Sequence, residues 1–192
     1  MLVAGIALAL VALAAQVAAQ IIDFTVYDLR IGALNSNVDS SVFGVVSLAA
    51  EIAMACAAAW RGLESEHRGR WLVLAAIAAA LVVVRAAMPG SAVTVAAPVA
   101  VVFILVWSLT SNDPSRARTI VRVALFLLAF SFVVHIVGLK IVNSLGYDGN
   151  SWPYQVKSLL KHGSELAGWI LLATGILGGA RRFAPGALVS RR

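Results

Sequence analysis

Six apolar stretches, separated by short polar segments, dominate the pattern of this sequence. They lie at approximately residues 1–20, 42–60, 71–88, 92–110, 119–139 and 155–180. Each is close to the roughly 20 apolar residues that a helix needs to cross the hydrocarbon core of a bilayer. The pattern predicts an all-α fold, a polytopic integral membrane bundle of six transmembrane helices. We expect one transmembrane domain over residues 1–192.

The first apolar stretch has a competing interpretation as a signal peptide, because Val17-Ala18-Ala19 resembles a cleavage site. No basic segment precedes it, so we expect a spanning helix instead. Mixed three- and four-residue spacing of apolar residues predicts that the helix continues to about Leu34. Alternating apolar residues over 24–31 leave a short strand as the alternative.

Three turn and capping signals mark later boundaries. Asp39 or Ser40 is a natural N-cap for the second helix, and Ser151 for the last one. Pro89-Gly90-Ser91 predicts a tight turn between the third and fourth helices.

Composition agrees with the membrane interpretation. Apolar residues make up 61% of the chain and charged residues 12%, whereas soluble domains are nearer half apolar and a quarter charged. The formal net charge is +6, but the basic residues fall in short loops, which indicates membrane topology and argues against nucleic-acid binding. The single cysteine, Cys56, excludes an intrachain disulfide and is best explained as a small packing residue.

The distribution of basic residues predicts that both termini are cytoplasmic. With that orientation, the inner loops carry ten of the fifteen Lys and Arg residues: Arg61, Arg68, Arg70, Arg116, Arg118, Arg122, Arg181, Arg182, Arg191 and Arg192. This asymmetry follows the positive-inside rule. Aromatic residues then form two interfacial belts, with Trp60, Trp71 and Trp107 inside and Tyr147, Trp152 and Tyr154 outside.

Five ionisable residues from four predicted helices fall at one depth in the outer leaflet: Glu51, Arg85, His135, His162 and Glu165. A charge near the middle of a bilayer costs several kcal/mol unless it is paired or hydrated. We therefore expect these residues to share a water-accessible or hydrogen-bonded polar pocket.

Small residues predict which helices approach closely. Ser164, Gly168, Gly175 and Gly179 form a stripe along the last helix, and Ala49, Ala53 and Ala57 form one along the second. Such faces let neighbouring helices pack tightly in a membrane. We expect the second, fifth and sixth helices to form a centre with Glu51, His135 and Glu165 facing inward.

Structural roles also fit several of these residues. Glu51 pairs with Arg85 or Lys140 in one interpretation, as a bridge that only supports the fold. In another, Arg85 extends to the outer headgroups, as Lys157 and Lys161 are expected to do.

The three-residue spacing of His162 and Glu165 resembles half of a metal site, since ligands at i and i+3 converge on one ion. His135, His162 and Glu165 are therefore weak metal candidates. A hydrogen-bonded packing role for His135 and a favourable helix-dipole contact for Glu165 are the competing interpretations.

Three functions remain open from the sequence. The first is a small membrane protein whose outer-leaflet pocket binds a small molecule, a proton or an ion, in a transport-like or sensing role. The second is an accessory subunit of a larger membrane complex. The third is an outward-facing enzyme that uses a metal or haem on a lipid-like substrate, although no catalytic motif is present. We expect a multi-pass cell-membrane protein in contact with lipid, either as a homo-oligomer or within a complex; the sequence identifies no cofactor.

Overall fold

The computed structural model describes residues 1–35, 41–87 and 96–180, and all regular structure in these ranges is helical. The elements are α1 (Leu2–Val26), α2 (Val42–Glu64), α3 (Arg68–Ala87), α4 (Ala96–Leu109), α5 (Ser115–Val133), η1 (Val134–Gly138), α6 (Leu139–Ser144) and α7 (Trp152–Gly178). The segment η1 is a π-helical turn, and α5, η1 and α6 form one continuous rod over Ser115–Ser144. The all-α bundle predicted from the sequence is confirmed.

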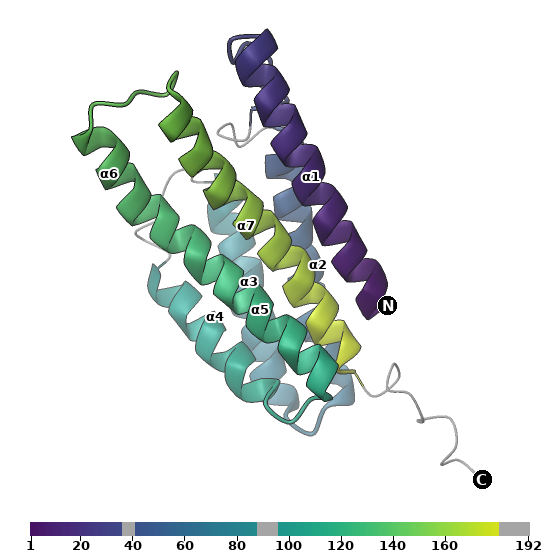
Figure 1. Cartoon of the computed structure of the whole chain (residues 1–192). Helices are drawn as coiled ribbons and strands as arrows, with labels where there is room; N and C mark the ends of the chain where they lie inside the picture. The colour runs from purple at the N-terminus through teal and green to yellow at the C-terminus, as the bar shows by residue number, and fades with distance from the viewer. Residues whose placement is uncertain (36–40, 88–95, 181–192) are drawn as a thin grey trace.

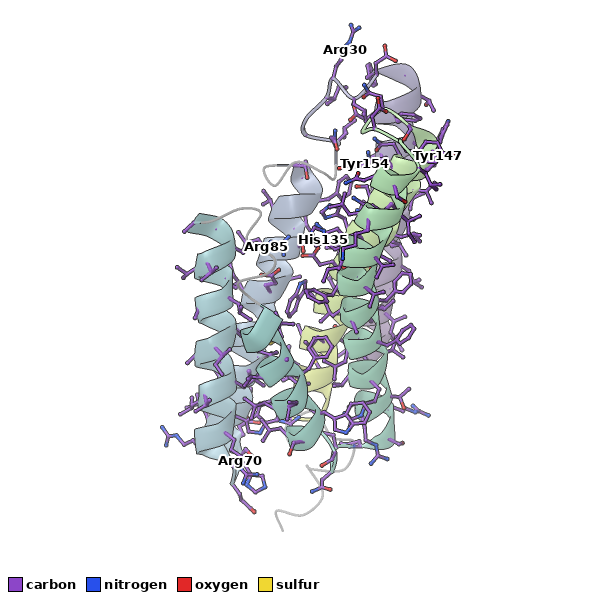
Figure 2. All side chains as sticks on the ribbon, turned by 90° about the vertical axis from the view of Figure 1, so that its left-hand side faces the viewer. Arg30, Arg70, Arg85, His135, Tyr147 and Tyr154 are labelled. Carbon is purple, nitrogen blue, oxygen red and sulfur yellow. The ribbon has the colours of Figure 1, made fainter. Side chains whose placement is uncertain are left out.

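The described rods alternate in direction along the chain (Figure 1). The first turn of α1 and the last turn of α7 meet at one end, where Gly178 lies against the side chain of Leu2. Figure 2 shows Arg70 at this same end and Arg30 and Tyr147 at the opposite end. We refer to these as the Arg70 end and the Tyr147 end. The cytoplasmic location of the Arg70 end stays a prediction.

Four helical segments among the described residues are long and apolar enough to cross a membrane: Leu2–Val26, Val42–Glu64, Arg68–Ala87 and Ser115–Ser144. The apolar segment Val99–Leu109 of α4 is shorter than these four. The polar residues of α7 lower its hydropathy, although its 27 residues reach about 40 Å at 1.5 Å per residue.

The helix α7 lies at the centre of the bundle, where it packs against α1, α2 and α5 (Figure 1). Its glycines allow this close packing. A Cβ atom at Gly168 would lie 2.8 Å from Leu128 of α5, and one at Gly175 would lie 2.6 Å from Val121. On the side of α1, a Cβ at Gly163 would lie 2.7 Å from Leu13. Gly168 and Gly175 of the predicted stripe therefore let α5 approach closely, as expected, whereas Gly179 lies against Arg61 and Asp113.

The second predicted stripe is wrong for two of its three residues, since only Ala57 is buried, at 2% exposed. Ala49 and Ala53 are exposed, whereas Ala50, Glu51 and Met54 are buried. Successive residues turn by about 100° around a helix, so Ala49 and Ala53 lie on the side opposite to Glu51. The two features could not face inward together, and the buried face of α2 contains Glu51.

The end of α1 also differs from both alternatives drawn from the sequence. The helix ends at Val26 because Asp28 and Leu29 adopt positive φ angles of 49° and 60°, and no strand follows in the described residues. Ser41 caps α2, accepting a hydrogen bond from the Gly44 amide at 3.1 Å.

Several sequence predictions fall wholly or partly outside the described residues. Asp39, Ser40, the turn at 89–91 and the arginines after residue 180 belong to this set. Ser151 is the N-cap residue of α7 as predicted, although its hydroxyl donates to the Asp148 carbonyl instead of capping the helix.

The aromatic belts are partly supported. Trp60 and Trp107 are exposed, as is Trp152 at the other end. Trp71 was expected at the inner interface, but it is only 1% exposed and belongs to the hydrophobic core, with the guanidinium of Arg61 4.7 Å from the centre of its ring.

Candidate functional site

A cluster of charged side chains from three helices lies inside the bundle. Arg85 of α3 forms ion pairs with Glu51 of α2 and Glu165 of α7. The Arg85 Nη1 atom is 2.7 Å from Glu165 Oε1, and it also donates to the Ser47 hydroxyl at 3.3 Å. His162 Nδ1 lies 3.8 Å from Glu165 Oε2. Four of the five residues predicted to form a polar pocket are therefore brought together.

These four side chains are largely shielded from the surroundings of the protein. The exposed fractions are 7% for the Glu51 side chain, 27% for Arg85, 18% for His162 and 19% for Glu165. Glu51 therefore does not face lipid, and Arg85 turns inward instead of extending to the headgroups. Figure 2 places Arg85 between the two ends of the bundle, closer to the Tyr147 end.

His135 lies at a similar height in the bundle but outside the network of ion pairs (Figure 2). It belongs to η1, and its Nδ1 atom is buried without a hydrogen-bond partner among the described residues. A π-helical turn changes the direction in which following side chains project, and such turns are frequent at functional sites. The ion pairs described here do not include His135.

Two lysines of α7 approach the cluster from the Tyr147 end. Lys157 was expected to extend toward lipid headgroups, but it is only 9% exposed. Its Nζ atom lies 4.3 Å from the centre of the Tyr154 ring, where a cation–π interaction holds it. Lys161 interacts electrostatically with both His162 and Glu165. The carboxylates therefore have lysine cations near them on the side of the Tyr147 end.

The metal interpretation gains no support from this geometry. Within residues 1–35, 41–87 and 96–180, no group of three or more His, Cys, Asp or Glu side chains is arranged to hold a metal ion. Glu165 and His162 approach each other, but Arg85 already contacts Glu165. A guanidinium at that position would repel a cation.

A row of buried polar residues on α1 was not predicted from the sequence. Gln16, Gln20 and Asp23 are at most 1% exposed, and they are three of the four buried residues of this helix. Gln20 Nε2 donates to Gln155 Oε1 of α7 at 2.6 Å. Asp23 Oδ1 accepts from the Ile31 amide at 3.0 Å. The spacing of four and three residues, in an otherwise apolar helix, was the available signal for a polar face toward α7.

A small cavity lies between Gln16 and the charge cluster. It has a volume of about 10 Å³ and is lined by Gln16, Phe43, Gly44, Ser47, Arg85 and His162. Both polar atoms of the Gln16 amide are buried without a hydrogen-bond partner in the described part of the chain. A cavity of this size is just large enough for one water molecule.

A second buried ion pair, also missed from the sequence, lies near the Arg70 end. Arg61 of α2 donates two hydrogen bonds to Asp113, at 2.9 and 2.7 Å, and one to the Ile176 carbonyl of α7 at 3.0 Å. Both side chains are at most 11% exposed. This pair joins α2, the loop before α5 and the end of α7.

Comparisons with protein-family models, with curated proteins and with solved structures find no match for this chain.

Proposed function

We propose that this chain is a multi-pass protein of the cell membrane that binds a proton at the cluster of Glu51, Arg85, His162 and Glu165. The observation that carries the proposal is the sharing of one guanidinium by two buried carboxylates from different helices. Ionisable residues inside membrane helices are costly, and for that reason they are functional candidates by default.

The net charge of the carboxylates and the guanidinium that contact each other favours a proton as the ligand. Two carboxylates and one guanidinium carry a net charge of −1 when all are ionised. A proton on Glu51 or Glu165 removes that excess, and His162 lies close enough to Glu165 to pass a proton to it. Among the described residues, Lys157 and Lys161 of α7 and His135 of η1 are further titratable groups near these side chains.

The size of the cavity argues against a larger ligand. A volume of about 10 Å³ accommodates a water molecule but no organic molecule. Among the ligands considered from the sequence, a proton needs no additional space. The cations of Arg85 and Lys161 also disfavour a metal ion beside Glu165.

Proton binding at this position would alter helix packing. The ion pair between Arg85 and Glu165 connects α3 to α7. Neutralising Glu165 removes the charge that holds this contact, so α3 gains freedom to move relative to α7. A sensing or transport-like role follows, in which pH changes the arrangement of helices near the Tyr147 end.

Infrared spectroscopy of the protein reconstituted in liposomes tests this proposal. We expect a carbonyl band of a protonated carboxylic acid that titrates with pH, and that is lost or shifted in Glu51→Gln or Glu165→Gln. Glu66→Gln is the matched control, because Glu66 is exposed near the Arg70 end. A folded protein whose titrating carboxyl bands are identical in wild type, Glu51→Gln and Glu165→Gln contradicts the proposal.

The same preparation examines the two alternatives. Metal in stoichiometric amounts, or a haem absorption band, that disappears in Glu165→Gln would favour the enzyme. Stable association with a larger membrane complex, together with an absence of any titrating carboxyl in the cluster, would favour an accessory subunit whose charges only maintain the fold.

A further inference from the structure

The interface between α1 and α7 contains more buried polar groups than packing requires. Asp23, Gln20 and Gln16 are buried in succession along α1, from the Tyr147 end toward the charge cluster, and Gln20 bonds to α7. Gln20 and Gln155 bond to each other across this interface, and Gln155 also donates to the carbonyl of Gly149. Leucine or alanine at these positions would serve packing between apolar helices equally well.

Gln16 is the residue of this row that most needs an explanation. Its amide oxygen and nitrogen are both buried, and neither has a hydrogen-bond partner among the described residues. Buried polar groups are nearly always satisfied by protein or by ordered water. The cavity beside Gln16 is polar, since Ser47, Arg85 and His162 line it, and its volume suits a single water molecule.

We propose that this cavity holds one ordered water molecule, bound by the Gln16 amide, through which protons reach His162 and the cluster. The water site is inferred from the buried Gln16 amide and the cavity beside it. The proton route, in contrast, rests on the function proposed above. In the transfer step, a hydronium ion of the surrounding water gives a proton to the bound water as an O–H bond of that bound water breaks and an N–H bond forms on His162. The hydronium ion becomes water, so no hydroxide is left in the cavity.

The arrangement gives each group a separate role. Gln16 positions the water and is a positioning residue, because it does not itself accept the transferred proton. His162 receives the proton and lies 3.8 Å from Glu165, which is the next acceptor. The contact between Gln20 and Gln155 keeps α1 against α7 above the cavity, at 2.6 Å.

Gln16→Met is the most direct test of the water, since methionine has nearly the shape of glutamine but cannot hold a water molecule by hydrogen bonds. With a bound water, we expect the variant to lose an internal-water O–H band, identified in the wild type by its shift in H₂¹⁸O. We also expect a lower unfolding midpoint. If no water is bound, the wild type should show no such band, and Gln16→Met should have a higher unfolding midpoint. The reason is that the substitution then removes an amide with unsatisfied hydrogen bonds. That pair of results overturns the water site.

The proton route is tested by kinetics. After a rapid pH jump, the carboxyl band of the wild type reports proton uptake. We expect Gln16→Met to slow this uptake about tenfold, the effect of removing one hydrogen bond from the transfer step, with the amplitude preserved. Ala18→Leu is the control, because Ala18 is on the exposed side of α1 at similar depth.

Gln16→Asn provides a second variant that retains the amide, and it should keep both the water band and an uptake rate near that of the wild type. Unchanged uptake in Gln16→Met, with normal titration at equilibrium, overturns the route and leaves the proposed function intact. A wild-type protein with no titrating carboxyl contradicts the proposed function and the route together, while the water band still reports on the site at Gln16.

Discussion

Arg85 Nη1 lies 2.7 Å from Glu165 Oε1, and this ion pair attaches α3 to the central helix α7. Elsewhere α3 packs mainly against α2 and α4. The same guanidinium also contacts Glu51, so a single side chain connects three helices at one depth. Stability and the proposed proton binding therefore depend on the same residue.

Replacing Arg85 by Met is expected to reduce the free energy of unfolding by about 3–5 kcal/mol, because two buried carboxylates then lose their counter-ion. Unfolding in mixed micelles, followed by circular dichroism, measures the effect. The triple variant Arg85→Met/Glu51→Gln/Glu165→Gln should regain a large part of this loss, since no buried charge remains. A triple variant as unstable as Arg85→Met would show that charge is not the cause.

The close contact between α5 and α7 predicts a marked effect of small substitutions at Gly175. A Cβ atom there would lie 2.6 Å from Val121 Cγ2 and 3.3 Å from the Ala117 carbonyl oxygen. Gly175→Ala should therefore destabilise the protein by about 1–3 kcal/mol, the usual cost of overpacking. Gly69→Ala is the control in α3, with nothing within 4 Å, and it should be neutral or stabilising by up to about 1 kcal/mol. Equal unfolding midpoints for the two variants would argue against the close approach.

Replacing Arg61 by lysine is expected to destabilise the protein, although the charge is kept. Its guanidinium donates twice to Asp113 and once to the Ile176 carbonyl, a fork that an ammonium group cannot reproduce. Arg61→Lys should lower the free energy of unfolding by about 1.5–3 kcal/mol, the value of one charge-assisted hydrogen bond. The exposed Arg70 gives the matched substitution Arg70→Lys, for which we expect no measurable change in the same unfolding assay.

The glutamine pair between α1 and α7 yields a fourth prediction. Gln155→Leu removes the acceptor of Gln20 Nε2, so this buried amide loses its hydrogen bond across the interface. The expected loss is about 1–3 kcal/mol in the free energy of unfolding. The double variant Gln20→Leu/Gln155→Leu removes both partners and should be more stable than Gln155→Leu alone. Additive effects in this double-mutant cycle would show that the two side chains do not interact.

The sequence by itself determined the fold class and the residues that had to be explained. Long apolar runs require helices in a bilayer, because every backbone polar group must be satisfied within its own segment. The cost of burying charge singled out Glu51, Arg85, His135, His162 and Glu165, all but His135 of which belong to the ion-pair cluster. The small residues of the last helix indicated a close neighbour. These inferences depend on local composition and spacing, which the sequence carries directly.

Only the tertiary structure decided how those residues meet. The rotation of each helix about its axis determines whether Ala49 or Glu51 faces inward, and a sequence rich in alanine on all sides leaves that rotation undetermined. The position of α7 at the centre, surrounded by α1, α2 and α5, explains why a helix with lysines and a glutamate belongs in this bundle. It also explains why Gln16, Gln20 and Asp23 are buried: their helix faces a polar neighbour, and the contact between two polar faces exists only once the chain has folded.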